Sequence, residues 1–312
     1  MGSFLIAVNA ILPITAMILL GVLTGRTGMI SKQSFREFNR FVFRFSLPLT
    51  LFMNIVSADL RSMMDPKLIL YCFVCITATA LAGMLVMRRS SLPDSKKGVI
   101  VQDLIRGNFV ILGPPLVQSI YGDAAAGIPS LLAAWFVPYF NLAATLILER
   151  YSGEKTDLAH TVIHVLKNPM IMAALAAIFL QLLHISLPSM VMNVLTTANR
   201  MTTPLALFVL GGLFEFSSLR ENAKILSVFC FVRLIVLPLI ALTGAVMLGY
   251  REAVLVSILV LMGGPIAVSS YAMSVEMKGD GDLAAQIILV STILVIPTFI
   301  AGITILGTLG YL

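Results

Sequence analysis

Residues 106–122, RGNFVILGPPLVQSIYG, place Gly113, Pro114 and Pro115 in the middle of an apolar segment that is long enough to enter a membrane. Proline removes one backbone donor, and its ring clashes with the carbonyl group one turn earlier, so two adjacent prolines predict an interruption of the helix. Backbone groups freed in this way are tolerated at membrane depth only inside protein or beside a water-filled cavity. The stretch therefore predicts a broken membrane helix next to a cavity.

The rest of the chain has the composition of a polytopic membrane protein. Of its 312 residues, 59% are hydrophobic and only 12% are charged, and the mean hydropathy is +0.99, far outside the range of soluble globular domains. Apolar segments of about 20 residues, the length that spans a bilayer, recur along the whole chain. They predict an all-α polytopic membrane protein with ten transmembrane helices: Phe4 to Thr24, Phe38 to Ser57, Lys67 to Met87, Val99 to Tyr121, Ala124 to Leu148, Asn168 to Ile185, Thr196 to Phe214, Ala223 to Leu248, Ala253 to Met277 and Leu283 to Leu309.

The basic residues indicate how these helices are oriented. A pI of 9.4 also suits a nucleic-acid-binding protein, but the Lys and Arg residues gather on alternate connectors, as in the run Lys32, Arg36, Arg40 and Arg44. This is the pattern of the positive-inside rule. It predicts a multi-pass membrane protein with both termini on the periplasmic or extracellular side and no nucleic-acid partner.

The two halves of the chain share a pattern. Residues 48–52, PLTLF, reappear as residues 204–208, PLALF, and the Gly-Pro-Pro of the fourth span is matched by Gly263-Gly264-Pro265 in the ninth. Five spans per half place the second half upside down relative to the first, as in many secondary transporters. We therefore expect two inverted five-helix repeats, residues 1–148 and 168–312, joined by a short cytosolic connector, residues 149–167. Their broken fourth and ninth helices are expected to cross.

Crossed, broken helices predict a substrate site at the crossing. Helix N-termini directed at the crossing favour a carboxylate or another anion. Asn108 can both donate and accept, and the hydroxyl groups of Ser269 and Ser270 follow the second break. The full predicted substrate-binding set is Asn108, Gly113, Pro114, Pro115, Gly264, Pro265, Ser269, Ser270, Thr50, Asn54 and Asn141.

Four ionisable residues inside the spans are candidates for gating or ion coupling, because such residues are costly in a membrane and usually functional. They are Asp103, Arg106, Arg233 and Glu276. Asp103 and Arg106 lie three residues apart and could instead neutralise each other on one helix face. Arg233 could pair with a carboxylate, pair with backbone carbonyl groups or attract the anion, and the sequence does not choose among these.

The chain resembles the auxin efflux carrier family, which includes the plant PIN-FORMED proteins and shorter bacterial relatives. In the fourth span, Asn108, Gly113, Pro115, Leu116, Tyr121 and Gly122 stand at the family's spacing. Further matches are residues 39–42 leading to 48–49, Asn168-Pro169, Arg233 ahead of Pro238, and Glu276, Asp282 and Pro297.

This resemblance implies a ten-helix transporter with a scaffold bundle and a transport bundle that works by elevator-type alternating access. Organic anions, such as indole-3-acetate or dicarboxylates, are the implied substrates, with Asn108 as a substrate contact and Pro115 and Pro265 at the crossing. The long cytosolic loop of many plant members is missing. The third span also lacks the charged residues of its plant counterpart, so auxin itself is not the expected substrate.

Two other functions fit parts of the sequence. A cation/proton antiporter of the same architecture needs a buried carboxylate at the crossing, whereas Asp103 and Glu276 are expected about ten residues from it. An intramembrane aspartyl protease fits the string GDGD at residues 279–282, but no second Asp lies in mid-span to form a dyad. His160 and His164 could hold a metal on a helix but have no third ligand nearby.

We therefore predict a secondary transporter of small organic anions, either mono- or dicarboxylates, in a bacterial inner membrane. It is expected not to be an enzyme and to need no cofactor or metal. Coupling to protons or sodium and the formation of a homodimer are left open.

Overall fold

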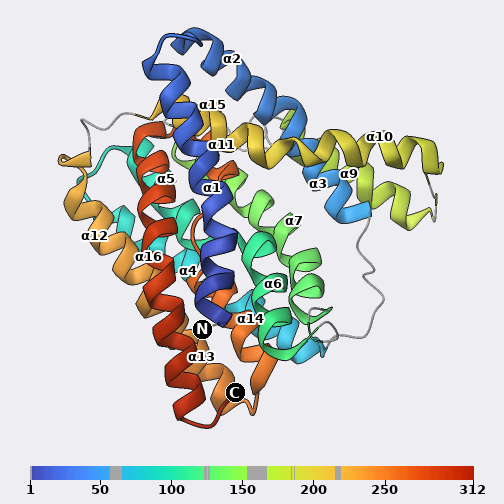
Figure 1. Cartoon of the computed structure of the whole chain (residues 1–312), viewed down its shortest axis with the longest axis vertical. Helices are drawn as coiled ribbons and strands as arrows, with labels where there is room; N and C mark the ends of the chain where they lie inside the picture. Colours follow the sequence, from blue (N-terminus) through green and yellow to red (C-terminus); the bar gives the residue numbers. More distant parts are fainter. Residues whose placement is uncertain are drawn as a thin grey trace.

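The computed structural model describes residues 2–56, 65–122, 125, 127–152, 167–183, 185, 187–214 and 219–312. Apart from one isolated β-bridge, between Gly107 and Ile266, these residues hold helices and no β-strand (Figure 1). The predicted all-α class is thus confirmed for this part of the chain. Most of the predicted connector 149–167, including His160 and His164, lies outside the described residues, as do Ser57 and Ala124 at the ends of predicted spans.

The helices follow one another closely along the chain. They are α1 (Gly2–Arg26), α2 (Lys32–Phe41), α3 (Leu47–Val56), α4 (Pro66–Arg88), α5 (Asp94–Ile105), α6 (Phe109–Tyr121), α7 (Gly127–Arg150), α9 (Pro169–Leu182), α10 (Ser189–Arg200), α11 (Thr202–Leu213), α12 (Ala223–Phe231), α13 (Leu237–Met247), α14 (Glu252–Gly263), α15 (Ser269–Glu276) and α16 (Gly281–Thr308). Two π-helical segments, η1 (Val42–Ser46) and η4 (Val232–Val236), join α2 to α3 and α12 to α13.

Four continuous helical stretches among the described residues are long and apolar enough to cross a membrane. They are Pro66–Arg88, Gly127–Arg150, Ala223–Met247 and Gly281–Thr308. Shorter apolar helices, such as Phe109–Tyr121, Pro169–Leu182 and Glu252–Gly263, pack among them. The architecture is that of a multi-pass membrane protein.

Proline explains the two π-helical segments. Each one ends directly before a Leu-Pro pair, Leu47-Pro48 or Leu237-Pro238. The proline ring would clash with the carbonyl group four residues earlier, so the helix widens by one residue. The Leu47 N–H accordingly donates to the Val42 carbonyl, and the Leu237 N–H donates to the Val232 carbonyl.

Glycines bring α1 against α11, so that the two backbones touch. A Cβ atom on Gly21 would lie 2.0 Å from the Phe208 carbonyl oxygen, and one on Gly211 would lie 2.0 Å from that of Ile18. The helices pack in two groups. The first contains α1 and α11 together with α3, which packs along α9, and its helices α3, α9 and α10 project to one side of the molecule (Figure 1). The second group consists of α4, α5, α7, α12, α13, α14 and α16.

The predicted break at Gly113-Pro114-Pro115 is wrong. Helix α6 runs from Phe109 to Tyr121 with both prolines inside it, and the interruption of the fourth span lies earlier, at residues 106–108. The φ angle that proline fixes is itself helical, so α6 continues through both residues despite two lost backbone donors and the crowding of their rings against carbonyl groups of the first turn. At the ninth span, α14 ends at Gly263, and Gly264 is extended with φ −68° and ψ 157°, the conformation that a residue before proline prefers.

Candidate functional site

The two helix interruptions meet in a short antiparallel contact. The Asn108 N–H donates to the Pro265 carbonyl at 2.7 Å, and the Ala267 N–H donates to the Arg106 carbonyl at 3.2 Å. Helices α5 and α14 end here, while α6 and α15 begin here. Backbone groups of each interruption would have no hydrogen-bond partners in lipid. Here the two interruptions supply these partners to each other.

Arg233 ties the ends of α5 and α14 together. It is 0% exposed, and its Nη1 donates to the carbonyl groups of Leu104 (3.1 Å) and Met262 (2.8 Å) while Nη2 donates to Leu261 (3.2 Å). These carbonyls lie in the last turns of the two helices, where donors are missing and the helix dipole is negative. Of the three roles left open by the sequence, the contacts select the pairing with backbone carbonyl groups.

Gly107 provides the space for this contact. A Cβ atom at position 107 would lie 2.6 Å from Nη2 of Arg233, closer than carbon and nitrogen can approach without displacement. A side chain at position 107 would therefore displace the guanidinium group of Arg233 from these carbonyl groups.

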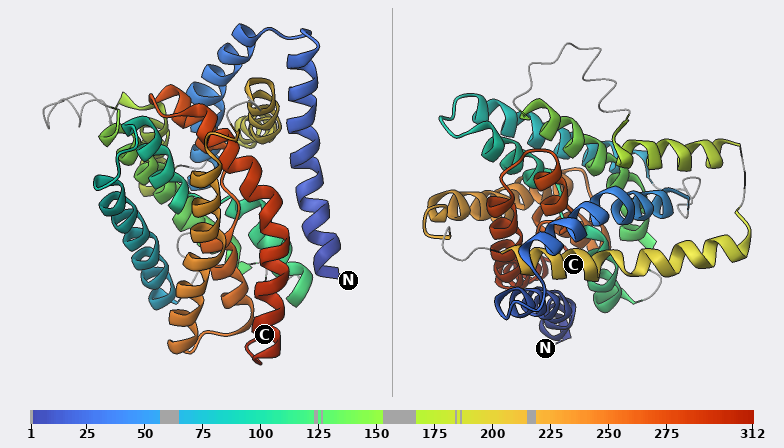
Figure 2. Two further views of the ribbon diagram at one scale, coloured as in Figure 1. Left: turned by 90° about the vertical axis from the view of Figure 1, so that its left-hand side faces the viewer. Right: turned by 90° about the horizontal axis from the view of Figure 1, so that it is seen from above.

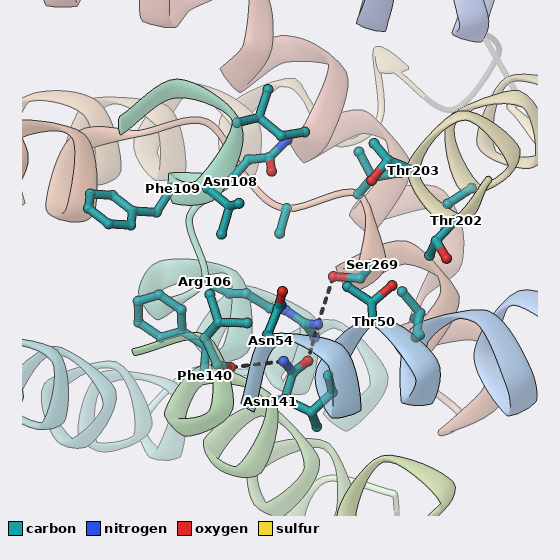
Figure 3. Close-up of a pocket in the computed structure, with 18 of the residues that line it drawn as sticks. Thr50, Asn54, Arg106, Asn108, Phe109, Phe140, Asn141, Thr202, Thr203 and Ser269 are labelled. Atoms are coloured by element: carbon teal, nitrogen blue, oxygen red, sulfur yellow. Dashed lines mark hydrogen bonds between the residues drawn. The ribbon is translucent and has the colours of Figure 1, made fainter. Parts of the chain in front are cut away.

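A cavity of about 280 Å³ lies beside the crossing (Figure 3). One wall consists of residues 106–111, residues 267–269 and α7, and the opposite wall consists of α3 and the junction of α10 with α11. Six of the predicted residues line it: Thr50, Asn54, Arg106, Asn108, Asn141 and Ser269. The structure thus gathers side chains from both halves of the chain at one cavity.

Polar groups of the cavity wall are available to a ligand. The side chains of Asn54, Asn108, Arg200 and Thr203 line the cavity and form no hydrogen bond or ion pair within the described part of the chain. The Asn108 side chain does not cap α6, so the first amide groups of this helix, which have no intrahelical acceptor, keep their hydrogen atoms for another partner. Phe109, Val110 and Ile111, which carry these groups, line the cavity as well.

Arg106 lies at the cavity wall and is held there by neutral groups. It is 3% exposed, and its Nη2 donates to Oδ1 of Asn141 at 2.5 Å and to Oγ of Ser269 at 2.7 Å (Figure 3). Arg106 makes no direct ion pair with Asp103 in the described structure, although the two opposite charges are near enough to attract each other. With Arg200, it makes two arginines at a cavity whose described lining includes no Asp or Glu.

Asp103 lies one turn before the crossing, in a separate buried network. It is 0% exposed and accepts a hydrogen bond from the Ser270 hydroxyl. Gln102 donates to the hydroxyl oxygens of Ser270 (3.0 Å) and Ser274 (2.6 Å), while Oδ2 of Asp103 has no partner among the described residues. The expectation that Asp103 is about ten residues from the crossing is wrong, because the fourth span is interrupted at 106–108 and not at its prolines.

The remaining predicted residues lie away from the cavity lining. Gly113, Pro114 and Pro115 belong to α6, Gly264 and Pro265 form the second interruption, and Ser270 faces Asp103. Gly113 lets α6 approach α7, since a Cβ atom there would lie 3.3 Å from Pro129. Glu276 lines a second cavity of about 330 Å³ with Glu149, Lys167 and Lys278.

Sequence reasoning missed the residues before Pro204. Asn199, Arg200, Thr202 and Thr203 line the cavity, and Oγ1 of Thr50 donates to Oδ1 of Asn199 at 2.6 Å. A signal for them was present, because Pro204 matches Pro48 in the repeated PLxLF pattern and residues near Pro48 were already candidates.

The protease-like string has a structural role here. The Asp280 side chain accepts a hydrogen bond from the Leu283 N–H at 2.9 Å and caps the N-terminus of α16. Asp280 also lies 3.9 Å from Nζ of Lys96. Asp280 therefore stabilises the start of α16.

Comparison with known proteins places this architecture in a family. A family model described as "Membrane transport protein" matches residues 6–301. An uncharacterized transporter of Methanothermobacter thermautotrophicus is 23% identical over 295 residues, covering 93% of this chain and 95% of that protein. The uncharacterized transporter YfdV of Escherichia coli K12 is 26% identical over 244 residues, 74% of this chain and 76% of its own.

A plant protein also matches part of the chain. Auxin efflux carrier component 8 of Arabidopsis thaliana is 32% identical over 128 residues, which cover 39% of this chain and 35% of the plant protein. These relatives are named as transporters or carriers and not as enzymes. The chain belongs to the membrane transport protein family that includes the auxin efflux carriers.

Proposed function

We propose that this membrane transporter carries small organic anions, namely mono- or dicarboxylates, through the cavity beside the crossing. The observation that carries this proposal is the charge of the cavity wall. Arg106 and Arg200 contribute two positive charges, the first turn of α6 contributes the positive end of its dipole, and no described lining residue is acidic. Such a wall favours a carboxylate over a cation.

Asn108 is the proposed specificity contact for the carboxylate. Its backbone N–H donates to the Pro265 carbonyl, whereas its side chain lines the cavity and has no hydrogen-bond partner among the described residues. A carboxamide can donate to a carboxylate oxygen beside the amide groups of the α6 N-terminus. Asn54 and Thr203 offer further polar contacts from the opposite wall.

We further propose ten membrane spans in two inverted repeats, with elevator-type alternation of the crossing against the opposite wall. Matched positions of the two halves support this plan, because Leu47 and Thr203, each directly before a matched proline, both line the cavity, as do Thr50 and Ala206. The start of α1 and the end of α16 lie toward the same end of the molecule (Figure 2), as an even number of spans requires. In the positive-inside arrangement this end is periplasmic or extracellular, in a bacterial inner membrane.

Asp103 keeps a second candidate open, a cation/proton antiporter. Its carboxyl group lies beside the crossing and has one unpartnered oxygen. Asp103 does not line the cavity, and the two arginines that do, Arg106 and Arg200, would repel a cation. We therefore assign Asp103 to proton coupling of anion transport and not to cation binding.

Transport by reconstituted protein tests the proposed function. The purified protein is first screened by thermal shift against a panel of mono- and dicarboxylic acids, and the stabilising acids are then used as radiolabelled substrates in proteoliposomes. Asn108→Ala is expected to lower transport 10- to 100-fold, roughly the loss of one hydrogen bond to a charged group. Asn193→Ala, which changes an exposed asparagine of α10, is the matched control and should transport like the wild type.

Two results would contradict the proposal. One is proton flux driven by sodium or lithium gradients without any carboxylate flux, which supports the antiporter. The other is full transport by Asn108→Ala, which removes this side chain from the substrate site.

A further inference from the structure

Helix α2 is anchored to the protein by one of its three faces. The Phe35 side chain is 0% exposed, and its ring lies over Gly212, where a Cβ atom would come within 2.2 Å of it. The ring also contacts that of Phe208, with centroids 5.4 Å apart. This face holds α2 on α11, at the end of the molecule away from the chain termini (Figure 2).

A second face of α2 and η1 is an exposed aromatic stripe. Phe38, Phe41 and Phe45 are 41%, 48% and 52% exposed, and their spacing of three and four residues places them on one side of the helix. The rings of Phe41 and Phe45 stack with centroids 5.2 Å apart. In a membrane protein, such a stripe lies at the boundary between lipid acyl chains and headgroups.

The third face is basic. Arg36, Arg40 and Arg44 follow one another at intervals of four residues, and all three are exposed. None of them forms an ion pair or a side-chain hydrogen bond within the described residues. Glu37 is the single acidic residue of α2 and η1, and it accepts a hydrogen bond from Gln33 at 3.4 Å.

We propose that α2 and η1, the end of the second span that precedes α3, lie at the membrane interface and bind the headgroups of anionic phospholipids in the adjacent leaflet. The aromatic stripe enters the leaflet, and the three guanidinium groups bind lipid phosphates, for which their planar donor geometry is suited. The buried face leaves the helix no freedom to turn these groups elsewhere. This inference rests on the membrane location of the chain and not on the substrate of the proposed transport.

Lipid bound at this surface bears on the transport cavity through the chain itself. Segment η1 leads directly into α3, whose Thr50 and Asn54 line the cavity. The Ser46 carbonyl at this junction accepts hydrogen bonds from the hydroxyl groups of Thr50 (3.0 Å) and Thr202 (3.3 Å). Anionic lipid is therefore expected to stabilise one wall of the cavity as well as α2.

Lipid binding by purified full-length protein tests this proposal. Dioleoyl phosphatidylglycerol is titrated into the detergent-solubilised protein, and retained lipid is counted by native mass spectrometry, with dioleoyl phosphatidylcholine as the neutral comparison. The variant Arg36→Gln/Arg40→Gln/Arg44→Gln is expected to bind phosphatidylglycerol on the order of 100-fold more weakly. The control Arg88→Gln/Arg89→Gln/Lys224→Gln removes the same charge from other exposed positions and should bind like the wild type.

A second variant separates lipid binding from damage to the fold. Phe41→Ala/Phe45→Ala leaves the arginines in place and is expected to weaken the binding of both lipids, because it removes the apolar contact. Equal binding by the arginine variant and the wild type would overturn the proposal, as would equal retention of the two lipids or displacement of phosphatidylglycerol by millimolar inorganic phosphate. An arginine variant that also loses its cooperative thermal unfolding is replaced by the three single substitutions, each of which should show part of the loss.

Discussion

Gly107→Ala is the substitution that most directly tests how the crossing is held together. The added Cβ atom would lie 2.6 Å from Nη2 of Arg233 and 3.4 Å from the Leu261 carbonyl oxygen. Arg233 cannot move aside freely, because its guanidinium group donates to three backbone carbonyls of α5 and α14. The methyl group is therefore expected to break at least the bond from Nη2 to Leu261.

The magnitude follows from that bond. A hydrogen bond to a charged group contributes about 1.5–3 kcal/mol to stability. Replacing glycine with alanine stabilises the folded protein by about 0.4–1 kcal/mol, because alanine restricts the unfolded chain. The net loss in the free energy of unfolding is then roughly 1–2 kcal/mol, and for a chain of this size the midpoint of thermal unfolding should fall by about 1.5–3 °C.

The buried cysteines supply the assay. Cys72 and Cys230 are free thiols buried in the fold, so a thiol-reactive fluorogenic maleimide reports their exposure as the detergent-solubilised protein is heated. Gly127→Ala is the matched control, because a Cβ atom at position 127 meets nothing within 4 Å. Arg233→Met supplies the second background, and Gly107→Ala should cost almost nothing there because the guanidinium group is gone.

Two outcomes would refute the reasoning. An unfolding midpoint for Gly107→Ala equal to that of Gly127→Ala would show that the space beside Arg233 is not needed. An equal loss in the wild-type and Arg233→Met backgrounds would show that the cost of the alanine does not come from Arg233.

Two further changes test the other side of the crossing and the Asp103 network. Gly264→Ala places a Cβ atom 2.4 Å from the Val260 carbonyl oxygen and should lower stability by more than about 3 kcal/mol, whereas Pro114→Ala/Pro115→Ala should keep or raise the thermal midpoint, because α6 is continuous through both prolines. A strongly destabilised proline variant would restore the prolines as determinants of the crossing. Asp103→Asn keeps an acceptor for Ser270 but cannot ionise, and is expected to flatten the pH dependence of carboxylate transport in proteoliposomes. An unchanged pH profile would exclude proton coupling through Asp103.

The candidate site was predictable in part, for reasons that differ between residues. Asn108, Ser269, Thr50, Asn54 and Asn141 were expected from their place near the breaks or as polar residues in apolar spans, and the cavity collects all five. Arg200 and Thr203 were missed because they precede the PLALF repeat at a helix junction, where the match to residues 48–52 was not extended backward along the chain. Their position at the cavity follows from the packing of α10 and α11 against the crossing.

The amino-acid sequence alone determined the helical class, the membrane location and the second interruption, where Gly263-Gly264-Pro265 acts through local sterics. Tertiary structure decided the rest. The fourth span is interrupted at Arg106, Gly107 and Asn108 because backbone groups of residues 265–267 pair with them and because Arg233 donates to the Leu104 carbonyl at the end of α5. These partners are distant in the chain, whereas the two prolines, which are local, remain inside a helix because their fixed φ angle is compatible with it.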